Sequence, residues 1–171
     1  MDDRNSLDRV AKTRPLEILL VEDGWTDAKL TIYAIRRCGV HHRLTLVRRL
    51  DEARAFLRRT GVFARAPEVH LMLLDLMLPD GSGLSLMDPD ERSAWPGRPT
   101  TVVLTASEDE ALIQRCGDAG VVELLRKPVR EEGFLSLVRR HQKLRLLAEA
   151  APSRRELNIG PTAAVPVTTD N

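Results

Sequence analysis

The chain has 171 residues, 43% of them hydrophobic and 30% charged, which suffices for one domain of ordinary size with a packed core. Its net charge of +1 argues against a general nucleic-acid binder, and no apolar run approaches the 18 residues of a membrane span. No apolar signal segment begins the chain, and its two cysteines, Cys38 and Cys116, lie far apart. We therefore expect a cytoplasmic protein whose cysteines are ordinary core or near-core thiols.

Short apolar runs alternate with helical patterns along the chain. In chain order they predict a strand at Glu17–Val21, a helix at 26–38, a strand at His42–Val47, a helix at 51–59, a strand at Leu71–Asp75, a short helix at 84–88 that Pro89 ends or interrupts, a strand at Thr100–Thr105, a helix at 108–119, a strand at Val121–Leu125 and a long helix at 131–149. Such alternation predicts a three-layer α/β fold, with a five-stranded parallel sheet flanked by five helices in the doubly wound, flavodoxin-like manner.

Composition divides the chain into three parts. Residues 1–14 are polar and of mixed charge, and we expect a flexible leader there. Residues 15–150 contain all the predicted elements and form the folded domain. Residues 151–171 hold three prolines, several threonines and little apolar bulk, and we expect them to be disordered.

Chemically active side chains follow four of the five predicted strands. Glu22 and Asp23 follow the first strand, Asp75 ends the third, Thr105 ends the fourth, and Lys127 comes just after the fifth. Because the carboxyl ends of parallel strands share one edge of a sheet, these groups should lie close together. Asp75 is then a nucleophile, a metal ligand or a buried structural acid.

The residue types at this edge match the transfer of a phosphoryl group to a carboxylate. Three clustered carboxylates repel one another and favour a divalent cation such as Mg²⁺, which prefers oxygen ligands. A lysine and a threonine hydroxyl can donate hydrogen bonds to phosphate oxygens. An aspartate that attacks phosphorus becomes an aspartyl phosphate, and the metal and the lysine would stabilise the transferring group.

The same residues resemble the motifs of the receiver domain of bacterial two-component response regulators over about residues 16–140. The matching positions are Glu22-Asp23, Asp75, Pro79 and Gly83 four and eight positions beyond it, Thr105-Ala106 and Lys127-Pro128. The segment Leu19–Asp23 and the arginine-rich stretch before Leu71 are similar to stand-alone regulators that accompany phytochrome-type histidine kinases.

The resemblance implies a role for each residue. Asp75 would accept a phosphoryl group from a sensor histidine kinase, and Thr105 and Lys127 would contact that group. The chain would catalyse its own phosphorylation and dephosphorylation without being an enzyme in the usual sense. The Mg²⁺ ligands implied are Glu22, Asp23, Asp75 and the backbone carbonyl of Met77.

Three positions depart from the family pattern. Leu124 replaces the usual aromatic residue three positions before the lysine, so an aromatic switch is excluded. Pro89 interrupts the helix after the acceptor strand. Trp25, close behind the acidic pair, either packs against the domain or contacts a partner.

Two other functions compete with the phosphorylated receiver. A pseudo-receiver would keep the fold but act as a binding or dimerisation module that needs no phosphorylation. A hydrolase with an aspartyl nucleophile is disfavoured because Met77 occupies the position where such enzymes usually carry a second aspartate.

The output of the domain is expected to pass through protein contacts, because no helix-turn-helix pattern follows that would indicate a nucleic-acid partner. The predicted helix over 131–149 is longer than the sheet requires. Its last turns would overhang the domain and expose Leu144, Leu146 and Leu147. We therefore expect a homodimer through this last helix.

Overall fold

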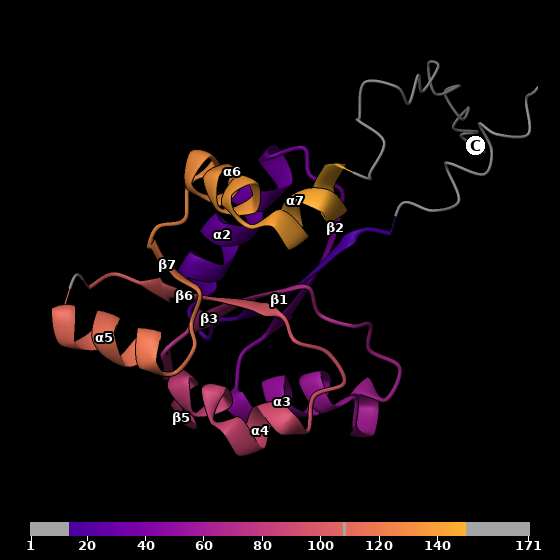
Figure 1. The fold of residues 1–171 in the computed structure, drawn as a ribbon, viewed down its shortest axis with the longest axis vertical. Helices are drawn as coiled ribbons and strands as arrows, with labels where there is room; N and C mark the ends of the chain where they lie inside the picture. The colour runs from indigo at the N-terminus through magenta and orange to yellow at the C-terminus, as the bar shows by residue number, and fades with distance from the viewer. Residues whose placement is uncertain (1–13, 108, 150–171) are drawn as a thin grey trace, which may run out of the picture.

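A five-stranded parallel sheet forms the middle layer of the fold (Figure 1). The structure, a computed structural model, describes residues 14–107 and 109–149. The strand order is β2–β1–β3–β6–β7, and all neighbours are parallel, as predicted. The bounds are β1 Leu16–Val21, β2 His42–Val47, β3 Leu71–Asp75, β6 Thr100–Thr105 and β7 Glu123–Arg126. Apart from Arg14, the predicted leader lies outside the described residues, as does the whole predicted tail.

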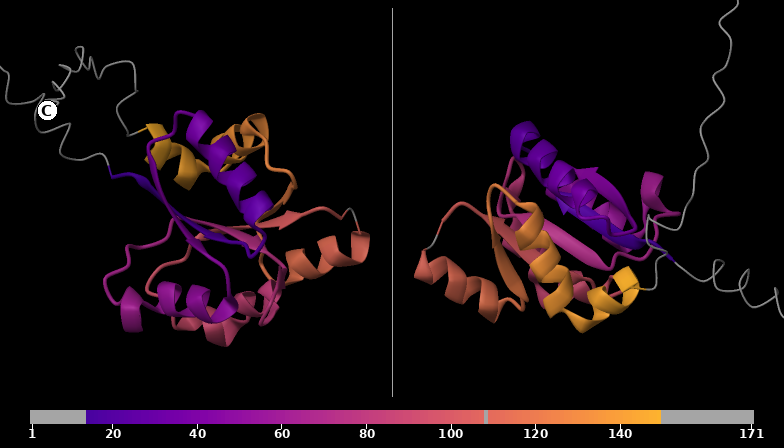
Figure 2. Two further views of the ribbon diagram at one scale, coloured as in Figure 1. Left: turned by 180° about the vertical axis from the view of Figure 1, so that it is seen from behind. Right: turned by 90° about the horizontal axis from the view of Figure 1, so that it is seen from above.

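Helices cover both faces of the sheet (Figure 2). One face carries α2 (Trp25–Arg37), α6 (Glu131–Arg140) and α7 (Gln142–Glu149); the other carries α3 (Leu50–Arg58), α4 (Pro89–Ser93) and α5 (Glu110–Asp118). Alternate residues of the central strands enter the two cores, so that Leu73 of β3 packs on the α2 side and Leu74 on the α3 side. This two-sided burial explains why the central strands read as unbroken apolar runs.

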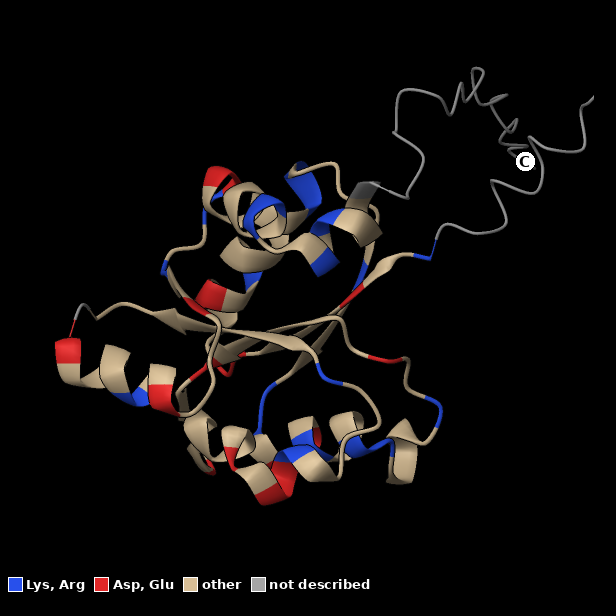
Figure 3. Cartoon of the chain, in the orientation of Figure 1, with Lys and Arg blue, Asp and Glu red and all other residues tan. Residues whose placement is uncertain are grey.

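The exterior carries both signs of charge. Figure 3 shows Lys and Arg together with Asp and Glu on the helices of each face. Within residues 14–107 and 109–149, no helix is long and apolar enough to cross a membrane.

Pro89 divides the segment between β3 and β6, as predicted. A short antiparallel hairpin of β4 (Met77–Leu78) and β5 (Gly81–Ser82) follows β3 and leads into the 3-10 helix η2 (Gly83–Met87). Pro89 is then the first residue of α4, where its missing N–H costs nothing.

The predicted long last helix is in fact two helices. His141 adopts an extended conformation (φ −97°, ψ 107°) between α6 and α7, and its Nε2 lies 2.9 Å from Oε2 of Glu123 on β7. The turn brings α7 back over the core. Leu144 is fully buried in this core, and Leu147 packs against the core from α7. Only Leu146 of the three leucines is exposed, at 56%, so the predicted overhang was wrong. The described residues therefore hold six α-helices rather than five.

The hairpin after β3 is fastened to the start of α3. The carboxylate of Asp80 accepts hydrogen bonds from the backbone N–H groups of Leu50 (2.9 Å) and Asp51 (3.1 Å). These backbone hydrogen bonds hold the pKa of Asp80 below its usual value. A carboxylate at this position stabilises a helix N-terminus, and it joins the loop that follows Asp75 to α3.

Candidate functional site

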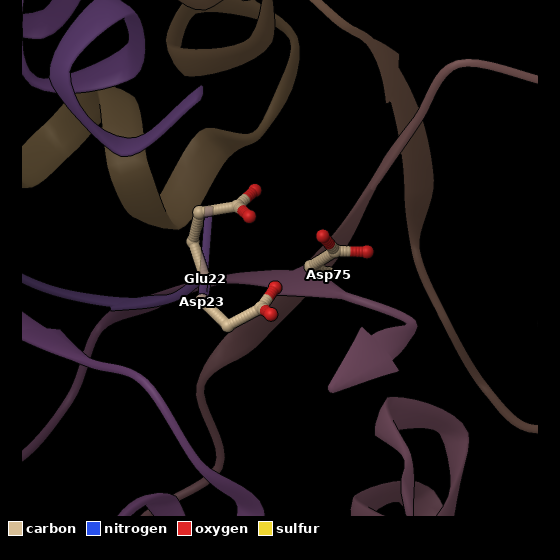
Figure 4. Close-up of side chains that lie close together, drawn as sticks. All are labelled: Glu22, Asp23 and Asp75. Atoms are coloured by element: carbon tan, nitrogen blue, oxygen red, sulfur yellow. The ribbon is translucent and has the colours of Figure 1, made fainter. Parts of the chain in front are cut away.

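Three carboxylates meet at the carboxyl edge of the sheet (Figure 4). Val21 of β1 is level with Leu74 of β3, so Glu22 and Asp75, one residue further on, are neighbours. One oxygen each of Glu22, Asp23 and Asp75 lies within 4.8 Å of the other two. The three carboxylates predicted to meet at the strand ends therefore do converge.

Lys127 is the counter-charge of this cluster. Its Nζ lies 2.7 Å from Oδ2 of Asp75, 2.5 Å from Oε2 of Glu22 and 3.1 Å from Oδ2 of Asp27. Its side chain is only 12% exposed. Burial alone would lower the pKa of Lys127, but its contacts with the carboxylates of Asp75, Glu22 and Asp27 outweigh that effect and raise the pKa. Lys127 is therefore a positively charged ammonium group at neutral pH.

Glu22 is the most deeply buried of the carboxylates, with 1% of its surface exposed. Its Oε1 accepts a hydrogen bond from the N–H of Gly24 at 2.9 Å. Its Oε2 is in ion-pair contact with Lys127 but is not aligned with it as a hydrogen bond. Burial raises the pKa of Glu22, although Lys127 and Gly24 oppose the shift.

The acidic cluster fits a hard divalent cation. The buried Oε2 of Glu22, without an aligned hydrogen bond, lies beside two further carboxylates that supply the oxygen ligands Mg²⁺ prefers. A cation would also relieve the repulsion among these charges.

The loop after β3 orients the Asp75 carboxylate. The N–H of Met77 donates to Oδ1 of Asp75 at 3.0 Å, while Lys127 holds Oδ2. Gly83 packs directly against this segment, since a Cβ at that position would lie 2.2 Å from the backbone oxygen of Asp75. This close approach explains why a glycine is required eight positions beyond the aspartate.

A groove of about 740 Å³ opens beside the cluster. Glu22, Asp23 and Asp75 line it together with Met77 and Pro79 of the hairpin and with Leu112 and Arg115 of α5. The acceptor candidate is thus reachable from solvent.

Thr105 lies at the end of β6, as predicted, but its hydroxyl is engaged locally. The Oγ1 accepts a hydrogen bond from the N–H of Ser107 at 3.0 Å and donates to the carbonyl of Ser107 at 3.3 Å. Leu124, at the position of the usual aromatic residue, is partly buried against the core on the α3 side.

Asp27 and Arg48 are site residues that the sequence did not single out. Asp27 lies in the first turn of α2 and reaches Lys127. The guanidinium of Arg48 donates to the backbone carbonyl of Asp23 and lies 5.0 Å from the ring centroid of Trp25. Trp25 is in contact with this cation and is still 57% exposed, so that most of its ring remains open to a partner.

Comparison with known proteins identifies a family for this chain. Residues 18–139 match the response regulator receiver domain. The response regulator Rcp1 of Synechocystis is 34% identical over 96 residues, which are 56% of this chain and 65% of that protein. The chain spans less than two thirds of the length of the first curated relatives it matches.

Solved structures agree with this match. The bacteriophytochrome response regulator RtBRR is 31% identical with a TM-score of 0.61, over 72% of this chain and 75% of that one. The phosphorylated cyanobacterial phytochrome response regulator RcpA is 30% identical with a TM-score of 0.57, over 80% and 91%. The chain therefore belongs to the response regulator receiver domain family, and its relatives include phytochrome-associated response regulators.

Proposed function

We propose that Asp75 accepts a phosphoryl group from the phosphorylated histidine of a sensor kinase. One observation carries the proposal: the Asp75 carboxylate lies 2.7 Å from the Lys127 ammonium, inside a carboxylate cluster that fits a metal ion. A bond forms between a carboxylate oxygen of Asp75 and phosphorus, and the bond from phosphorus to the kinase's histidine nitrogen breaks. The chain supplies the groups that promote this step and the later hydrolysis.

The surrounding residues would stabilise the transferring group. Mg²⁺ held by Glu22, Asp23, Asp75 and the carbonyl of Met77 would neutralise charge on the phosphoryl oxygens. The relative Rcp1 has been solved in a Mn²⁺-bound form, which supports the binding of a divalent metal by this chain. Lys127 would donate to a phosphoryl oxygen, and Thr105 would exchange its hydrogen bonds with Ser107 for one to the same group.

The partner is proposed to be a histidine kinase of the phytochrome type in the cytoplasm. The names of RtBRR and RcpA, which are phytochrome response regulators, support that class of kinase. Trp25, Leu30 and Tyr33 are large exposed side chains on α2, the helix that begins beside the acidic cluster, and they offer the kinase a contact surface.

A homodimer through the last helices remains part of the proposal, with Leu146 of α7 as its exposed apolar side chain. We expect sedimentation analysis at tens of micromolar to give twice the mass of the chain, and Leu146→Asp to give the monomer mass. A wild-type monomer with and without phosphorylation would contradict this arrangement.

A single experiment tests the phosphoacceptor. The protein is incubated with Mg²⁺ and a small phosphodonor, and its mass is measured before and after base treatment. We expect a base-labile gain of one phosphoryl group that disappears in Asp75→Asn. If the mass does not increase under any condition, the chain is instead a binding module that works without phosphorylation. A mass gain that persists in Asp75→Asn would show that another residue is the acceptor.

A further inference from the structure

Lys127 has a third carboxylate partner that plays no part in the proposed metal site. Oδ2 of Asp27 lies 3.1 Å from Nζ and accepts one of its hydrogen bonds. Asp27 is outside the carboxylate group whose oxygens lie within 4.8 Å of one another. Its side chain is 42% exposed, whereas that of Glu22 is 1% exposed, so Asp27 contacts the ammonium group from the solvent side.

The three contacts pull Nζ in different directions. An ammonium group has three N–H donors, and three carboxylates surround this one. Glu22 and Asp75 draw it toward the buried end of the site. Asp27, in the first turn of α2, draws it toward the mouth, where a transferring phosphoryl group would arrive.

We propose that Asp27 is a positioning residue, which holds Lys127 outward so that its ammonium group meets the incoming phosphoryl oxygens. The inference rests on the proposed phosphoacceptor function of Asp75. Asp27 touches neither the phosphoryl group nor the metal; it acts through Lys127. Without its carboxylate, Nζ would retreat toward Glu22 and Asp75 and stabilise the transferring group less well.

Phosphorylation kinetics test this role. We expect Asp27→Asn to slow phosphorylation by a small phosphodonor in Mg²⁺ about two- to fivefold, the range expected for a partly exposed ion pair. Asp51→Asn is the matched control, because Asp51 is an acid at the same edge of the sheet that pairs with Arg49. It removes an equal charge and should leave the rate unchanged. Simple repulsion of the anionic donor predicts the opposite sign for Asp27→Asn, namely a faster reaction.

A double-mutant cycle shows whether the effect passes through Lys127. In a Lys127→Ala background, followed over hours by mass spectrometry, Asp27→Asn should cause no further slowing. An unchanged or faster rate for Asp27→Asn in the wild-type background, or a slowing of equal size without Lys127, would overturn the positioning role.

The metal-free protein gives a second readout that needs no phosphorylation. Two hydrogen bonds, to Asp27 and Asp75, and the ion pair with Glu22 should slow the exchange of the Lys127 ammonium protons with water, as seen by ¹⁵N-resolved NMR. We expect faster exchange in Asp27→Asn and unchanged exchange in Asp51→Asn. Equal exchange in all three proteins would overturn the inference. A wild-type protein that accepts no phosphoryl group would overturn the proposed function instead, and the exchange measurement would still decide the role of Asp27.

Discussion

Replacing Gly83 by alanine should destabilise the domain at the point where the hairpin meets the acceptor strand. An added Cβ would lie 2.2 Å from the backbone oxygen of Asp75, more than 1 Å short of the 3.4 Å at which ordinary contacts begin. It would also lie 3.1 Å from Cδ1 of Leu74 and from Cα of Leu76. Two of these three obstacles are backbone atoms, so the clash cannot be relieved by a rotamer change.

The free energy of unfolding should fall by about 3 kcal/mol, the upper part of the range for overpacking a core. For a domain of this size the melting temperature should then fall by roughly 10 °C. Urea unfolding followed by far-ultraviolet circular dichroism measures the change. Mg²⁺ affinity should fall in parallel, because relieving the clash displaces the backbone of Asp75.

Gly117→Ala is the matched control. Gly117 lies in α5, and an added Cβ there meets nothing within 4 Å. Since alanine is the better helix former, this variant should be more stable than wild type by up to about 1 kcal/mol. A Gly83→Ala protein as stable as wild type would refute the close packing of the hairpin against Asp75.

Two further predictions concern α7 and Glu123 of β7, which contacts the turn before α7. Leu144→Ala should lower the free energy of unfolding by about 2–4 kcal/mol because Leu144 is fully buried, whereas Leu146→Ala should change it by less than about 0.5 kcal/mol; equal effects would contradict the packing of α7. Burial works to raise the pKa of Glu123, but hydrogen bonds from Arg140 and His141 outweigh it and lower the pKa. The carboxylate therefore stabilises the fold above its unfolded pKa, near 4.5, and this contribution is lost as the pH falls through the lowered folded pKa. Glu123→Gln should cost about 1 kcal/mol at pH 7, a value discounted for solvent screening, and nothing in strong acid; a cost independent of pH, measured by urea unfolding, would contradict this account.

The part of the site that could be predicted from sequence is the part that follows from strand order. Glu22, Asp23, Asp75 and Lys127 each follow a buried apolar run, and a parallel sheet brings such positions to one edge. Asp27 does not follow from strand order, because it lies in the first turn of α2 rather than at a strand end. In this topology the first turn of each helix that follows a strand also lies near the carboxyl edge of the sheet, and that rule would predict Asp27 as a site residue.

Contacts between distant segments could not be predicted in this way. The sequence predicts a helix that begins at Asp51, but the carboxylate that binds the N-terminus of α3 belongs to Asp80, 29 positions later. Likewise the apolar spacing continues through His141, so periodicity alone gives one helix there. The break depends on the turn at His141 and its contact with Glu123, and neither is encoded in local spacing.

The return of α7 bears on where this module can be cut or joined to other proteins. The family match ends at residue 139, yet the apolar core continues to Leu144 and Leu147. A chimera joined directly after α6 would lack Leu144. The core residues that Leu144 covers would then be exposed to water, and this apolar surface would promote aggregation. Junctions placed beyond Glu149 would keep α7, so the unit for engineering is at least one helix longer than the residues matched by the family.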